Sequence, residues 1–312
     1  SVVISLRFSG TKQTKFGLNF FAILSISLVE AISKFIGTLI FFLIFCKSLS
    51  LICLLSSLKC IVIEFAPLFS AINTRWAPKA RYPQQEAHKQ QQATHLEVME
   101  ALLRSGANPN ARLTKHLWFM EYTFSHLGID TSGATPFWRA THALDVPAMK
   151  LLVEYGADPG IPTTKGQDRR SRGGGGEDPS GLPPVPFGGP AVHPIHVAAG
   201  HGYGTGYAGY SHRHAPDAWL PTVKYLVEEH GADVNARDHN GYSPVHNAAS
   251  RGDIEMIRYL VDKGADVMVV SRRGQTTVDM ANGPQQRIQP FPEAMALLES
   301  LGAKNNHNCV SC

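Results

Sequence analysis

A sequence repeat with a period of about 33 residues is the feature that most constrains the fold of this chain. A Gly-Ala pair closes each of five units, and the glycines are Gly106, Gly156, Gly231, Gly264 and Gly302. The interval from Gly231 to Gly264 is one uninterrupted period, and the other intervals are longer because they contain insertions. One such unit cannot bury its apolar face alone, so neighbouring units must stack to form a core.

Each unit carries residues that begin and end a pair of helices. Pro136, Pro194 and Pro244 stand at a first helical position, where the missing N–H of proline costs nothing. Thr135 and Ser243 precede two of them as caps. The glycine after the second helix suits a left-handed helix end. Apolar residues recur with the i, i+3, i+4 spacing of a helix face. These are Met99, Leu102 and Leu103, then Met149, Leu152 and Val153, then Ile257, Leu260 and Val261.

The first helices also share a sequence motif. TPFWRA (135–140), HPIHVA (193–198) and SPVHNA (243–248) resemble the T-P-L-H-x-A pattern of the ankyrin repeat, and the period of the glycines agrees with it. The resemblance covers about 93–305. It implies an all-α repeat solenoid, an ankyrin stack of helix-turn-helix units with β-turn fingers. It also implies a non-enzymatic scaffold that binds a partner protein.

The spacing predicts the domain boundaries. They are a hydrophobic segment (1–76), a partial first repeat (77–113), a finger insertion (114–132), a repeat (133–166), a Gly/Pro-rich disordered insertion (167–190), a repeat (191–240) with an inserted loop (201–218), a repeat (241–273), a C-terminal repeat (274–305) and a flexible tail with C-x-x-C (306–312).

Residues 1–76 differ in composition from the remainder. They hold 7 Lys/Arg against 2 Asp/Glu, and stretches 16–29, 35–46 and 48–58 carry no charge. About 20 apolar residues in a helix can span a bilayer. Three interpretations stay open: a membrane-inserting segment, a non-native upstream extension, or a buried hydrophobic domain. The protein would be membrane-associated if the apolar part within 16–72 is genuine, and soluble otherwise.

The helix expected at 95–105 has no T-P-L-H-like helix directly before it. Residues 84–94 are polar and lack paired alanines. We therefore expect Met99 and Leu103 to lie at an uncovered edge of the stack, with further repeats upstream in the natural protein.

Two ligand classes are disfavoured. GTGYAG (204–209) matches the glycine fingerprint of dinucleotide-binding loops, but that fingerprint follows a strand and opens a helix. Here it lies in the 201–218 insertion after the PIHVAA helix, so we predict no dinucleotide and no other cofactor. Residues 77–312 hold 22 Lys/Arg against 23 Asp/Glu, which argues against a nucleic-acid partner.

An alternative function is a metal- or thiol-dependent redox activity in the loop 193–217 and the C-terminal tail. Its candidate ligands are His193, His201, His212, His214, Cys309 and Cys312. His196 is set apart from them, because it occupies the repeat position of His246, where ankyrin histidines bond neighbouring turns. Residues 1–312 contain no G-x-S-x-G, P-loop or H-E-x-x-H motif, so we predict no catalytic residues.

The resemblance also implies where a partner binds, along the finger tips and the inner face of the first helices. Carried over by position, these residues are Arg237, His239, Asn240 and Tyr242 in one finger, Ser271, Arg272 and Arg273 in the next, and Asn247, Ser250 and Arg251 on the helix between them.

Overall fold

The computed structural model describes residues 67–76, 92–115, 130–167, 178–202, 214–283 and 289–308. All of them belong to one compact unit, Ile63–Cys312. Within these ranges the regular elements are helices, with isolated β-bridges joining Thr164 to Pro190 and Val270 to Thr276. The predicted all-α repeat architecture is confirmed.

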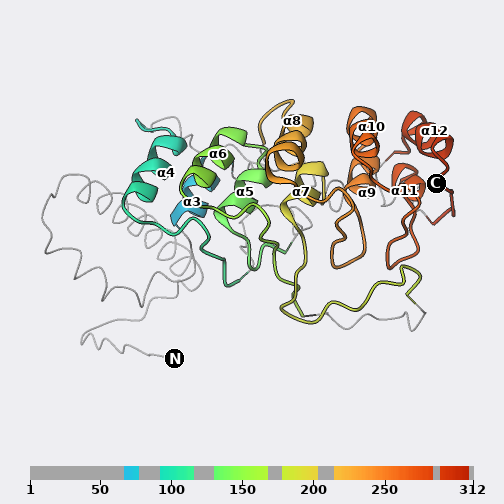
Figure 1. The fold of residues 1–312 in the computed structure, drawn as a ribbon, viewed down its shortest axis with the longest axis horizontal. Coiled ribbons are helices and arrows are strands. Elements are labelled where there is room, and N and C mark those ends of the chain that lie inside the picture. Colours follow the sequence, from blue (N-terminus) through green and yellow to red (C-terminus); the bar gives the residue numbers. More distant parts are fainter. Residues whose placement is uncertain are drawn as a thin grey trace, which may run out of the picture. The chain divides into compact units, whose positions relative to one another are not determined.

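The helices follow one another in pairs. They are α3 (Pro67–Trp76), α4 (His95–Arg104), α5 (Pro136–His142), α6 (Val146–Glu154), α7 (Pro194–Ala199), α8 (Trp219–Lys224) running into the π-helical turn η3 (Tyr225–Glu229), α9 (Pro244–Ala249), α10 (Ile254–Asp262), α11 (Thr277–Ala281) and α12 (Pro292–Ser300). Each first helix contacts the first helix of the next pair, from α3 through α5, α7 and α9 to α11 (Figure 1).

The local sequence explains where the helices begin and end. The Thr135 side chain accepts a hydrogen bond from the Trp138 N–H at the start of α5, and Pro136 is the first helical residue. Gly156 and Gly264 follow α6 and α10 with φ of 86° and 91°, a left-handed conformation that costs glycine little. The alanines of the first helices are buried, which lets adjacent helices approach closely.

The predicted boundary at residue 76, between the hydrophobic segment and the first repeat, differs from the structure. Residues 67–76 form α3, which packs against α4 and α5. Met99 and Leu103 are only 0% and 5% exposed, so the prediction of an uncovered edge at these residues is wrong. Pro67-Leu-Phe-Ser-Ala71 begins with proline and an apolar residue and ends with alanine, as Pro244-Val-His-Asn-Ala248 does at the start of α9. This shared pattern is the signal in the sequence that could have identified α3.

Polar contacts fix α3 to the second pair. Trp76 Nε1 donates to Asp145 Oδ2 at 2.6 Å, and Arg139 donates from Nε to Asn73 Oδ1 at 2.6 Å and from Nη2 to the Trp76 carbonyl at 2.8 Å. Asp145 also caps α6 through the Ala148 N–H and contacts His95 Nε2 at 2.7 Å. Burial raises the pKa of Asp145, but the hydrogen bonds from His95 and Trp76 outweigh burial and leave this pKa below its usual value.

Two segments predicted to be disordered or flexible are ordered in part. Residues 178–190, which we call the strap, lie against the fingers that precede α9 and α11; residues 168–177 lie outside the described part. In the tail, the Asn306 and Asn308 N–H groups donate to Asp279 Oδ1 at 3.1 and 3.2 Å. Both segments are held by side chains distant in sequence, which local composition does not reveal.

Several predictions concern residues outside the described ranges. They are the possible membrane segment up to residue 66, most of the finger insertion 114–132, the GTGYAG stretch within 201–218, and the C-x-x-C end. Among the helices that are described, none has the length and apolar character needed to cross a membrane.

Candidate protein-binding surface at the fingers

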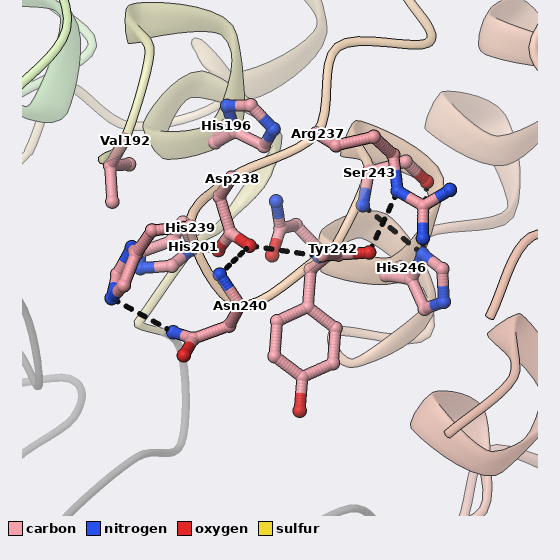
Figure 2. A network of polar contacts seen from close by, with 12 residues as sticks. Val192, His196, His201, Arg237, Asp238, His239, Asn240, Tyr242, Ser243 and His246 are labelled. Carbon is pink, nitrogen blue, oxygen red and sulfur yellow. Dashed lines mark hydrogen bonds and ion pairs between the residues drawn. The ribbon is translucent and has the colours of Figure 1, made fainter. Parts of the chain in front are cut away.

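The finger before α9 is a tight turn organised by Asp238. The buried carboxylate accepts hydrogen bonds at Oδ1 from the N–H groups of Asn240 at 2.9 Å and Tyr242 at 2.8 Å (Figure 2). The Asp238 N–H donates to the Tyr242 carbonyl, and the Gly241 N–H donates back to the Asp238 carbonyl. Gly241 has φ of 80°, which the turn requires. The finger is therefore closed by hydrogen bonds of its own backbone and of the Asp238 carboxylate.

Neighbouring fingers are bonded into one surface. The Arg272 N–H donates to the Asn240 carbonyl at 3.0 Å, and Arg272 Nε donates to the His239 carbonyl at 3.0 Å. Tyr242 Oη donates to Gln275 Oε1 at 2.5 Å. On the other side, the His239 N–H donates to the Ala191 carbonyl at 3.0 Å. Three successive repeats thus present a continuous, preformed edge.

The ten predicted partner-binding residues do not share one environment. In the fingers, Arg273 is exposed and His239, Asn240 and Tyr242 are half-buried. Arg237 turns inward, where Nε donates to the Gly241 carbonyl at 2.7 Å and Nη2 bonds the Val270 carbonyl. Burial lowers the pKa of this guanidinium.

Ser271 and Arg272 are engaged within the protein. Ser271 is fully buried, and its Oγ accepts the Gln275 N–H at 3.1 Å within its own turn. Arg272 is half-buried and holds the strap. The exposed polar part of this edge is therefore smaller than the sequence suggested.

The predicted extension onto α9 is buried. Asn247 and Ser250 are each 4% exposed, because α9 is enclosed by α7, α10 and α11, and Ser250 Oγ donates to the Asn247 carbonyl. Arg251 lies 3.6 Å above the Trp219 ring and pairs with Asp253 at 3.2 Å. A contact between a partner and the side chains of Asn247 or Ser250 is incompatible with this packing.

The histidines at the motif position are structural, as predicted. His196 Nε2 contacts the Ala236 carbonyl at 3.0 Å, and His246 Nε2 contacts the Gln275 carbonyl at 3.3 Å, so each one joins its helix to the following finger. Because a carbonyl only accepts, Nε2 carries the proton. Burial lowers the pKa of both rings to about 3, which keeps them neutral.

The candidate metal ligands are dispersed. His193 Nδ1 contacts the Gly160 carbonyl at 3.3 Å, and His214 Nδ1 contacts the Ala215 carbonyl at 3.0 Å. His201 Nδ1 lies 3.3 Å from Asp238 Oδ2. His212, Cys309 and Cys312 lie outside the described residues. Within the part of the chain that the structure describes, no three His, Cys, Asp or Glu residues are placed to hold a metal ion.

The buried pair of His201 and Asp238 is electrostatically unusual. Burial lowers the pKa of His201 to about 3, with a further decrease from the nearby His239. Burial also raises the pKa of Asp238 to about 7, although the hydrogen bonds from the backbone of Tyr242 and Asn240 oppose the rise. Burial thus favours the neutral imidazole of His201 and the neutral carboxyl of Asp238. We interpret their contact as structural.

Known proteins share the repeat. A family model described as "Ankyrin repeats (many copies)" matches residues 211–261. Alpha-latrocrustotoxin-Lt1a of Latrodectus tredecimguttatus is 28% identical over 175 residues, which are 56% of this chain and 9% of the toxin. Protein phosphatase 1 regulatory subunit 12A of Rattus norvegicus is 39% identical over 112 residues, 36% of this chain and 8% of the relative.

A third relative, ankyrin repeat domain-containing protein 49 of Bos taurus, is 42% identical over 52 residues, 17% of this chain and 22% of the relative. The chain thus spans less than a quarter of the length of these relatives.

Proposed function

Because this chain is an ankyrin-repeat protein, we propose that it is a non-enzymatic scaffold whose finger edge binds a partner protein. The proposed contact surface consists of the exposed and half-buried finger residues Arg273, His239, Asn240 and Tyr242. Ankyrin repeats are built for protein–protein interaction, and the stack offers the extended edge that such contacts use.

The observation that supports this proposal most strongly is the bonding between fingers. Hydrogen bonds from Arg272 to His239 and Asn240, and from Tyr242 to Gln275, hold polar groups of two repeats in fixed positions. A surface that is ordered before binding loses little conformational entropy when a partner docks.

The relatives support a protein partner in general terms. One of them is named as a regulatory subunit of protein phosphatase 1. By its chemistry, the partner is a protein surface complementary to the exposed Arg273 guanidinium and to the half-buried side chains of His239, Asn240 and Tyr242.

The test compares proteins captured by the purified full chain with those captured by charge variants. Arg273→Glu combined with Asn240→Ala alters the finger edge, and Arg258→Glu makes the same charge change on the exposed face of α10. We expect the finger variant to reduce recovery of the specific partner about tenfold or more, a loss of about 1.4 kcal/mol, and the α10 variant to leave recovery unchanged. Equal recovery with all three proteins would contradict the finger proposal.

A further inference from the structure

The strap contains a run of prolines with a restricted backbone. Residues 182–187 read Leu-Pro-Pro-Val-Pro-Phe. Each proline fixes φ near −65°, and a residue that precedes proline is displaced from the helical region toward extended conformations. Residues 182–186 all meet one of these conditions, and the structure gives them neither helix nor turn. The sequence therefore favours a polyproline II segment.

The exposure of the side chains follows the period of that helix. Polyproline II has three residues per turn, so residues three apart share a ridge. Leu182 lies beside Gly241 of the finger before α9 and is half-buried, as is Val185, whereas Pro183, Pro184, Pro186 and Phe187 are all exposed. Phe187 is 71% exposed, the largest value among the exposed large apolar side chains of the described residues. Within 182–186, one ridge thus packs on the protein and the three prolines face solvent, and the exposed Phe187 ring stands at the turn that follows.

The strap is held through its backbone and its polar end, which leaves the proline rings free. Arg272 donates to the Leu182 carbonyl at 3.1 Å and to the Pro183 carbonyl at 2.6 Å, and it pairs with Asp178. Lys165 Nζ donates to the Val185 carbonyl at 2.9 Å, and the Lys165 N–H donates to the Gly189 carbonyl at 2.8 Å. These bonds come from two different repeats, so the segment is fixed at several points along its length.

We propose that Pro183–Phe187 is itself a ligand, displayed for a protein domain whose groove is lined with aromatic side chains. Domains of the SH3, WW and EVH1 types bind P-x-x-P segments in this conformation. Pro183 and Pro186 have that spacing and lie on one exposed ridge. Because the repeats already order the segment, a partner loses less entropy on binding it than on binding a free peptide. This activity goes beyond finger recognition and is independent of Arg273.

The test titrates the purified full chain against a set of isolated SH3, WW and EVH1 domains, followed by the amide resonances of each domain. We expect at least one domain to bind with a Kd in the range of about 1–100 μM. Pro183→Ser combined with Pro186→Ser should weaken that binding about tenfold or more. Pro179→Ser is the matched control, because Pro179 is an exposed proline of the same strap outside the motif, and it should bind as the wild type does.

Two further variants separate display from folding. Phe187→Ala removes an exposed ring without altering a proline and should also weaken binding. Arg272→Ala releases the strap and should weaken binding a few-fold, whereas Arg273→Glu should have no effect on it. Thermal melts of each variant confirm that the repeats are folded. The proposal is overturned if no domain binds at about 1 mM, or if the double proline variant binds like the wild type. It is also overturned if Arg272→Ala strengthens binding, because the fingers would then be blocking access to the motif.

Discussion

The indole of Trp76 donates a 2.6 Å hydrogen bond to the Asp145 carboxylate, 69 residues away in sequence. This bond joins α3 to the cap of α6, and both side chains are buried. Together with the packing of α3 against α4 and α5, it makes Pro67–Trp76 the first helix of a repeat, although these residues lie within the segment 1–76 that differs in composition.

Trp76→Phe should therefore destabilise the stack. Phenylalanine keeps most of the packing but removes a donor from a buried carboxylate, which costs about 1–3 kcal/mol. The matched control is Trp138→Phe, which removes an indole donor from the neutral Val192 carbonyl and should cost less, about 1 kcal/mol. Urea unfolding measures both values, and a Trp76→Phe loss no larger than that of Trp138→Phe would argue against the charged contact.

Met99 should behave as a core residue. It is fully buried between α3 and its neighbours, so Met99→Ala should lower the free energy of unfolding by about 2–5 kcal/mol. Met268 is 48% exposed and gives the control Met268→Ala, with a change within about 0.5 kcal/mol. A small effect at Met99, with a higher monomer fraction in light scattering, would support the uncovered edge expected from the sequence instead.

Lowering the pH should destabilise the repeats already at pH values above those at which carboxylates usually titrate. Burial lowers the pKa of His196, His201 and His246 to about 3, whereas unfolded histidine titrates near pH 6.5. Between these values the unfolded chain binds protons that the folded chain excludes, so each histidine lowers stability by about 1.4 kcal/mol per pH unit as the pH falls from about 6.5 toward 3. The pKa of Asp238, raised to about 7, acts in the opposite direction but offsets only one of the three histidines.

His196→Gln tests this dependence, because it removes one titrating group from the buried set. The slope of unfolding free energy against pH between about 6 and 4 should decrease by about 1.4 kcal/mol per unit. His307→Gln replaces an exposed histidine and should leave the slope unchanged. An unaltered slope for His196→Gln would mean that this ring is accessible to protons in the folded state.

Glycine at position 252 should be more sensitive to substitution than glycine at 264. Both have positive φ, of 66° and 91°, so alanine is strained at either site by about 1–2 kcal/mol. A Cβ at Gly252 would also overlap the Phe291 ring, whereas one at Gly264 meets nothing within 4 Å. We expect Gly252→Ala to cost at least about 1 kcal/mol more in denaturant unfolding. Equal losses would show that Phe291 moves aside readily.

The sequence alone determined the repeat and the positions at which most of its helices begin and end. Pro136 and Pro244 at helix starts, Gly156 and Gly264 at helix ends, and the apolar stripe of α10 all act within one or two helical turns. Because each signal is local and recurs from one repeat to the next, the all-α stack and the structural role of His196 and His246 could be read without coordinates.

Tertiary structure decided what depends on residues far apart in the chain. The stretch from Pro67 to Gly106 is much longer than the one from Pro244 to Gly264, so the repeat spacing does not identify α3. The contacts of α3 with Asp145 and Arg139 identify it instead. The strap is ordered by Arg272, far along the chain from Asp178, and Asn247 is buried by helices of adjacent repeats. Composition and periodicity describe a residue's neighbours along the chain, whereas burial and long-range hydrogen bonds are properties of the packed stack.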